Sequence, residues 1–124
     1  MMKEFEFDKS TGTIIKYIGK ETDVVIPSEI DGVPVTSIGP RAFFECESVR
    51  NIAIPTGITS ICHDAFGLCK SLENVIIPEG VTSIGDSAFW YCKSLKVIAI
   101  PDNVKYIGKR AFGSCTSLQT VVII

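Results

Sequence analysis

The sequence predicts a repeat solenoid of the α/β type, in which similar coils of chain stack in one direction. A fifteen-residue pattern recurs every 23 residues, as "VTSIGPRAFFECESV" (35–49), "ITSICHDAFGLCKSL" (58–72), "VTSIGDSAFWYCKSL" (81–95) and "VKYIGKRAFGSCTSL" (104–118). Short β-branched segments that end at proline recur beside it, such as "NIAIP" and "NVIIP". One coil of this size cannot bury its own apolar residues, so the core must form between stacked coils.

The totals of the chain fit one domain and exclude several classes of partner. The 124 residues are 46% hydrophobic and carry a net charge of −2, which is enough apolar material for a single core. No run of lysine and arginine points to nucleic acid. The longest apolar runs are about four residues, far too short for a membrane span. The start, "MMKEFEFDKS", lacks the apolar region of a signal peptide.

The first 23 residues differ from the rest and predict an N-terminal β-hairpin cap. The segments "FEF" and "GTIIKYIG" flank the turn-rich "DKST". A solenoid needs such a cap because its end coil otherwise exposes the core.

Four full repeats, 24–46, 47–69, 70–92 and 93–115, and a partial one, 116–124, complete the predicted domain 1–124. The segment before each proline is predicted as a strand, and proline ends it because it has no N–H for the ladder. Stacking makes these strands one parallel sheet with a spacing of about 4.8 Å. The "VTSI" that follows is a second extended piece. In "AFxxC", the spacing i, i+1, i+4 predicts a short helical or 3₁₀ turn on the side opposite the sheet.

Two columns of identical residues are predicted to form the structural core ladder: Phe43, Phe66, Phe89, Phe112, and Cys46, Cys69, Cys92, Cys115. Buried cysteines behave as small hydrophobes. Neighbouring coils bring their Cα atoms to about 5 Å, which permits a disulfide, but parallel Cβ vectors disfavour it. Reduced thiols are therefore expected. A 23-residue spacing supplies no clustered metal ligands, so no metal and no cofactor is predicted.

The segment Cys62-His63-Asp64 contains the residue types of a nucleophile, a base and an orienting carboxylate. Three consecutive residues point their side chains apart, whereas a triad is assembled in space. No phosphate-binding glycine loop and no fixed pair of carboxylates is present either. The sequence therefore predicts that the protein is not an enzyme, with Cys62 as its most reactive thiol if exposed.

The pattern "SLxxVxIPxxVTSIGxxAFxxC" resembles the BspA-like, or treponemal-type, leucine-rich repeat over about residues 24–124. The resemblance implies a right-handed leucine-rich-repeat solenoid. It also implies a bacterial protein at the cell surface or secreted, which binds host or other cell-surface proteins without enzymatic activity. Cys62 departs from the pattern, since Gly39, Gly85 and Gly108 occupy its position in other coils.

Two outward surfaces are candidates for binding a protein ligand. The middle residue of each strand points out, which gives an apolar column on the sheet face: Val25, Ala53, Ile76, Ala99 and Val122. Large residues that the repeat does not require follow the core phenylalanine: Phe44, Leu68, Trp90 and Tyr91. Exposed apolar strips and unneeded aromatics are typical of contact sites. The alternatives are that small aliphatics suit a stacked sheet and that the aromatics cover the turn.

The chain stops inside a strand, "LQTVVII", with no polar cap after it. We expect either a fragment of a longer array or an end that pairs with another copy. The functional prediction is a non-enzymatic protein–protein interaction module within a bacterial surface adhesin. The alternative is a structural spacer that assembles end to end through Ile123 and Ile124.

Overall fold

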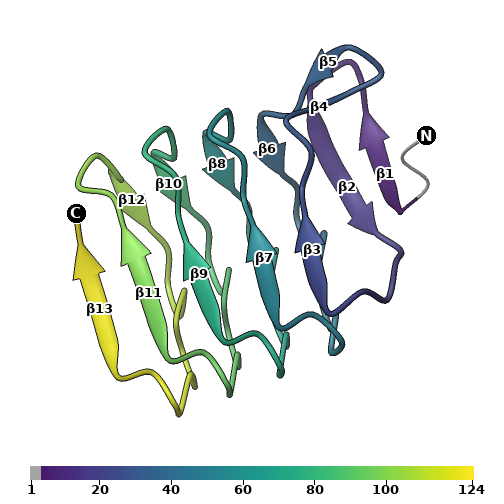
Figure 1. Cartoon of the computed structure of the whole chain (residues 1–124). Coiled ribbons are helices and arrows are strands. Elements are labelled where there is room, and N and C mark those ends of the chain that lie inside the picture. The colour runs from purple at the N-terminus through teal and green to yellow at the C-terminus, as the bar shows by residue number, and fades with distance from the viewer. Residues whose placement is uncertain (1–3) are drawn as a thin grey trace.

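The computed structural model describes residues 4–124 as a stack of coils (Figure 1). Each full coil contributes one strand to each of two main β-sheets, which form two sides of the stack. The five-stranded sheet contains, in spatial order, β3 (Asp23–Val25), β7 (Asn51–Ala53), β9 (Asn74–Ile76), β11 (Val97–Ile100) and β13 (Thr120–Ile123). Every neighbouring pair in it is parallel. Each strand comes from a different coil, so the chain is a parallel β-solenoid.

A second sheet runs behind the first, so the prediction of a single parallel sheet was incomplete. It contains β1 (Phe5–Asp8), β2 (Thr13–Tyr17), β6 (Ser37–Ile38), β8 (Ser60–Ile61), β10 (Ser83–Ile84) and β12 (Tyr106–Ile107). Its last four strands are the "SI" or "YI" pairs of the repeated pattern. The same 23-residue stacking that pairs the first set of strands also brings these short segments into register.

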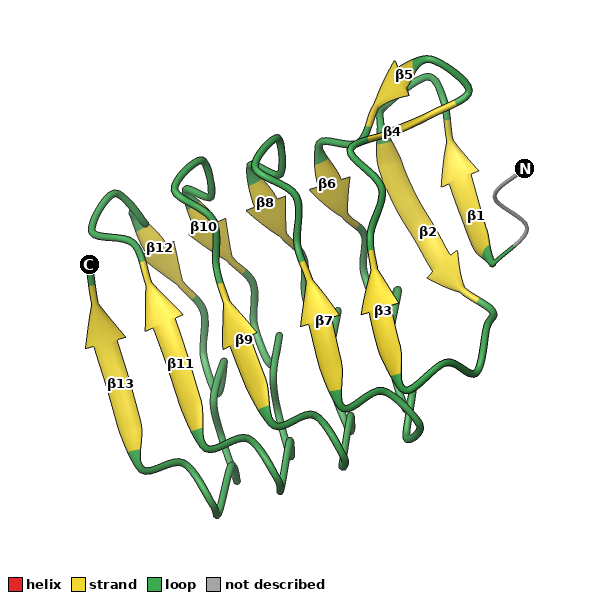
Figure 2. Cartoon of the chain, in the orientation of Figure 1, coloured by secondary structure: helices red, strands yellow, loops and turns green. Residues whose placement is uncertain are grey.

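The predicted helical or 3₁₀ turn is wrong, because residues 4–124 contain no helix (Figure 2). The turn side of each coil is a run of β-turns. The N–H of Phe44 donates to Arg41 O at 3.1 Å, whereas the N–H of Phe43 donates to Ala65 O of the next coil at 2.7 Å. Alternate amides thus bond within the turn and between coils, which leaves no helical ladder.

This turn geometry places non-glycine residues in the left-handed region of φ. The affected positions recur in every full repeat: Arg41, Glu45, Asp64, Leu68, Ser87, Tyr91, Arg110 and Ser114. Backbone strain often accumulates at functional sites. Here it follows the period of the repeat, so it belongs to the fold and marks no site.

The five extra residues of the first coil form a small hairpin of their own. The strands β4 (Glu29–Ile30) and β5 (Val33–Pro34) pair antiparallel. Between them, Asp31 and Gly32 have φ values of 51° and 81°, as the two central residues of a type I′ turn require. The insertion therefore leaves the parallel stack without disturbing its register.

The N-terminal strands β1 and β2 form an antiparallel hairpin, as "FEF" and "GTIIKYIG" predict. Its second strand also pairs in parallel with β6, so β2 is the first rung of the second sheet. The Tyr17 ring stacks on Phe43 with centroids 5.2 Å apart, and Phe5 lies 5.3 Å from Tyr17. The hairpin thus covers the first phenylalanine of the core ladder.

The core is a continuous stack of identical side chains along the solenoid. The ring centroids of Phe43 and Phe66 are 5.0 Å apart, those of Phe66 and Phe89 5.1 Å, and those of Phe89 and Phe112 5.5 Å. The first three rings are fully buried, and Phe112 is partly buried. The predicted phenylalanine column therefore lies in the core, where Phe43, Phe66 and Phe89 each pack between two other aromatic rings and Phe112 ends the stack.

Candidate protein-binding surface on the five-stranded sheet

The exposed face of the five-stranded sheet carries the apolar column that the sequence predicts. Side chains alternate along a strand, so Val25 and the residues equivalent to it point to solvent, while Val24 and Ile26 on either side of it point into the core. Val25 is 71% exposed and Ile76 is 70% exposed. Val25 pairs with Ala53, Ile76 with Ala99, and Ala99 with Val122. Of the column, Ala99 alone is only partly exposed.

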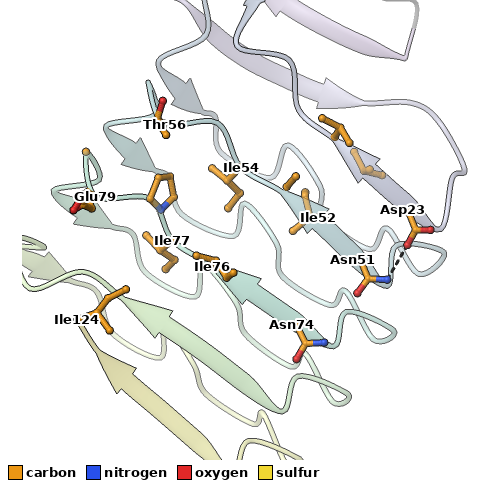
Figure 3. A pocket seen from close by; sticks show the side chains of 15 residues that line it. Asp23, Asn51, Ile52, Ile54, Thr56, Asn74, Ile76, Ile77, Glu79 and Ile124 are labelled. Carbon is orange, nitrogen blue, oxygen red and sulfur yellow. Dashed lines mark hydrogen bonds between the residues drawn. The ribbon is translucent and has the colours of Figure 1, made fainter.

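A groove of about 760 Å³ lies on this face across β3, β7 and β9 (Figure 3). Its floor and walls include Val25, Ala53, Ile54 and Ile76, and Ile124 of the chain end also lines it. This volume falls within the range of ligand pockets, and its lining is mostly aliphatic with a few polar groups. The column is therefore partly hollowed, and three of its members line the hollow.

The groove lies where the ladder between two coils is interrupted. β3 pairs with β7, and β9 with β11, over three residues each, but β7 pairs with β9 only at Asn51↔Asn74. Beyond that pair, the ends of β7 and β9 are not joined, and residues after both strands line the groove.

The backbone hydrogen bond of the residue after each strand shows where the ladder stops. The N–H of Ile26 donates to Ala53 O at 3.0 Å, and the N–H of Ile77 donates to Ala99 O at 3.1 Å. Within residues 4–124, the N–H of Ile54 has no acceptor. Ile26 and Ile77 are 2% and 1% exposed, whereas Ile54 is only partly buried. The core is thus accessible at Ile54 and closed at the equivalent positions of the neighbouring coils.

The rims of the groove carry polar and acidic side chains. On one side, Asn51 Nδ2 donates to Asp23 Oδ1 at 2.7 Å, and Asn74 follows in the next coil. On the other side lie Thr56 and Glu79. The side chains that line the groove include two carboxylates, those of Asp23 and Glu79, and no lysine or arginine. The groove is therefore apolar inside and negative at its edges.

Phe44 and Trp90, of the predicted aromatic set, have a packing role on the turn side. A Cβ added to Gly67 would lie 3.0 Å from Phe44 Cδ1, and one added to Gly113 would lie 3.1 Å from Trp90 Cδ1. Each ring thus fills the space that a glycine leaves one coil further on. The Arg41 guanidinium lies 4.0 Å from the Phe44 ring centroid. These contacts account for both rings without a ligand.

Leu68 and Tyr91 occupy equivalent left-handed positions of neighbouring coils, and both are partly buried. The Tyr91 ring lies 5.4 Å from the Trp90 ring, and Lys93 Nζ lies 4.6 Å from its centroid. The hydrogen bond and positive charge of Lys93 lower the pKa of Tyr91. Of the predicted aromatic set, Trp90 and Tyr91 thus have their rings in contact with each other.

The cysteine column forms a second ladder, of thiol hydrogen bonds. Three of its four thiols donate to the carbonyl of the phenylalanine one coil earlier: Cys69 to Phe43 at 3.0 Å, Cys92 to Phe66 at 3.1 Å, and Cys115 to Phe89 at 3.1 Å. All five cysteines are free. Burial raises the pKa of the Cys69 thiol above its ordinary value of 9.0, so this thiol is neutral and poorly nucleophilic near neutral pH.

The segment Cys62-His63-Asp64 lacks the geometry of a nucleophile and its base. Cys62 Sγ lies 3.6 Å from Ser37 Oγ, and His63 Nδ1 lies 3.5 Å from Asp64 Oδ2. Among the described side chains, no hydrogen bond joins Cys62 to His63. Nothing in the structure explains why this coil has Cys62 where others have glycine.

Residues 4–124 contain no group of three potential metal ligands. None of their segments forms a helix of the length and apolarity that a membrane span needs.

Stacked parallel strands with a 23-residue period define a leucine-rich-repeat solenoid. The chain belongs to the BspA-type leucine-rich repeat family, whose model matches residues 16–124 in six copies. No curated protein is similar enough in sequence to count as a match.

Solved structures of bacterial leucine-rich repeat proteins are similar over almost the whole chain. A protein from Bacteroides capillosus ATCC 29799 is 32% identical with a TM-score of 0.84, over 97% of this chain and 92% of that one. The T. pallidum leucine-rich repeat protein is 32% identical with a TM-score of 0.74, over 98% and 69%. A leucine-rich cell surface protein from Faecalibacterium prausnitzii A2-165 is 30% identical with a TM-score of 0.73, over 90% and 35%.

Proposed function

We propose that this chain is a non-enzymatic protein-binding module that holds its partner on the five-stranded sheet. Leucine-rich repeat domains commonly mediate protein–protein interactions, and solenoids use extended sheet surfaces for this purpose. The observation that carries the proposal is the exposed apolar column and the groove that hollows it. A contiguous exposed apolar surface on a folded domain is typical of an interaction site.

We further propose a bacterial surface adhesin as the setting of this module, with a host or other cell-surface protein as its partner. The support is the similar F. prausnitzii structure, which is named a cell surface protein. The affinity would come from aliphatic side chains buried at the centre of the sheet and from the polar rim that surrounds them.

The test is the binding of the purified chain to a panel of host matrix and cell-surface proteins by surface plasmon resonance. Ile76→Glu places a charge at the centre of the apolar column and should weaken binding by about tenfold or more. The matched control is Ile15→Glu, which changes an exposed isoleucine of β2 in the other sheet and should leave binding within about twofold of the parent. Circular dichroism checks that both variants fold.

The other outcomes also decide the matter. Binding that survives Ile76→Glu and is lost in Trp90→Ala or Tyr91→Ala would move the site to the turn side. No binding by a folded chain to any panel member would contradict the adhesin proposal.

End-to-end association is a second candidate, because the last strand exposes Val121 and Ile123, and Ile124 after it is exposed as well. If the chain associates end to end, sedimentation velocity should show a dimer that increases with protein concentration. Val121→Lys should abolish this dimer.

A further inference from the structure

We propose that the groove between β7 and β9 takes an extended peptide segment in which an aliphatic side chain lies next to a basic residue. This inference rests on the proposed function and names the chemistry of the partner. It follows from three properties of the groove: its shape, an unpaired backbone amide and the charge at its rims.

The shape of the groove selects an aliphatic side chain. Ala53 lies between the larger and highly exposed Val25 and Ile76 in the apolar column. All three residues line the groove, and the methyl group of Ala53 occupies less space than the side chains on either side of it. Since the ladder opens beside Ala53, Ile54 is reachable from the same groove. A branched aliphatic side chain placed there contacts apolar groups on several sides.

The backbone of the groove selects a peptide over a simple hydrocarbon. The N–H of Ile54 has no acceptor in residues 4–124, although Ile54 lines the groove. An amide N–H near an apolar surface is stabilised by any acceptor that reaches it. An extended peptide supplies carbonyl groups at regular spacing, and main-chain bonds of this kind give affinity when peptides bind sheet backbones. A peptide carbonyl therefore replaces the acceptor that β9 does not provide.

The charge at the rims selects a basic neighbour. Asp23 lies at one rim and Glu79 at the other, and the lining residues include no lysine or arginine. A carboxylate or phosphate ligand would face two like charges, whereas a lysine or arginine beside the bound aliphatic group meets an opposite charge. Exposed charges at a rim set specificity and association rate more than affinity. The groove thus discriminates between peptides of equal apolarity by their charge.

The experiment compares two acetylated, amidated and fluorescently labelled pentapeptides by fluorescence anisotropy with the whole chain. One has the sequence Lys-Leu-Val-Leu-Lys and the other has the sequence Glu-Leu-Val-Leu-Glu, so they share the aliphatic centre and differ only at the two charged end residues. We expect the lysine peptide to bind about tenfold or more tightly than the glutamate peptide. Ala53→Leu, which places a larger side chain in the groove, should remove binding of both.

Charge reversal at the rims tests the contribution of Asp23 and Glu79 separately from that of the apolar lining of the groove. Asp23→Lys combined with Glu79→Lys should reverse the preference between the two peptides. The matched control, Glu29→Lys, reverses an exposed carboxylate of β4 outside the groove and should keep the original preference. Equal binding of both peptides to the parent chain, or a preference that the double variant retains, would overturn the inference.

The failure of this inference differs from failure of the proposed function. If neither peptide binds, while a panel protein binds and Ile76→Glu abolishes that binding, the sheet face is the site and the peptide assignment is wrong. If the panel protein binds away from the sheet face, the proposed function itself is wrong. Ala53→Leu that folds and still binds the lysine peptide as tightly as the parent would place the peptide elsewhere.

Discussion

Phe89→Ala is expected to lower the free energy of unfolding by about 3–5 kcal/mol, as large aromatic truncations in protein cores do. The ring is fully buried and stacks on Phe66 at 5.1 Å and on Phe112 at 5.5 Å. The coils on either side are held at their spacing by backbone hydrogen bonds, so the cavity cannot collapse. Urea unfolding followed by circular dichroism measures the change.

Phe112→Ala is the matched control, because it removes the same side chain from the end of the stack. Phe112 is only partly buried and has a stacked ring on one side. Its truncation should cost clearly less than that of Phe89. A loss of under about 1 kcal/mol for Phe89→Ala would be too small for a truncated core aromatic and would contradict the stacked core.

Gly85→Ala is expected to destabilise the protein by about 1–3 kcal/mol, the usual cost of forcing atoms into a packed interior. A Cβ on Gly85 would lie 2.6 Å from His63 N and 2.8 Å from Cys62 C. Both are backbone atoms of the preceding coil, so only a separation of the two coils relieves the clash. The requirement at this glycine is close approach between backbones. Thermal and urea unfolding measure the effect.

Gly57→Ala provides the comparison for Gly85→Ala. A Cβ at Gly57 would meet only Val35 O, at 3.4 Å, which is an ordinary contact. Where the backbone accepts alanine, the exchange stabilises by up to about 1 kcal/mol through the unfolded state. Equal losses of stability for the two variants would contradict a clash between coils that is specific to Gly85.

The register of the sequence was enough to predict the core ladders and the outward column. Phe43, Phe66 and Phe89 recur at one spacing, and stacking places identical residues on top of one another, as the ring distances confirm. The exposure of Val25 and Ile76 follows from the alternation of side chains along a strand. These predictions needed only the period and the geometry of a strand.

The turn side could not be predicted in the same way. The spacing of alanine, phenylalanine and cysteine fits one face of a helical turn, and it fits a run of β-turns equally well. The left-handed positions that distinguish the two are occupied by residues such as Arg41 and Leu68 instead of glycine. The pairing between neighbouring coils, which only the three-dimensional stack supplies, decides in favour of β-turns.

The interruption of the pairing between β7 and β9 could not be predicted from the sequence. The segments "NIAIP" and "NVIIP" fit the repeat as well as the segments of the neighbouring coils do. The sequence therefore indicates the apolar column but does not indicate Ile54 and Glu79 as groove residues. The opening at Ile54 depends on where the pairing of β7 and β9 stops, and periodicity gives no information about that.

The measurement that tests this account most directly is amide hydrogen exchange by nuclear magnetic resonance on the unliganded chain. Exchange reports local opening residue by residue. If the ladder opens at the groove, the amide of Ile54 should exchange about tenfold or more faster than the amide of Ile77, whose N–H donates to Ala99 O. Protection of Ile54 equal to that of Ile77 would mean that β7 and β9 are joined, and the groove as described would not exist.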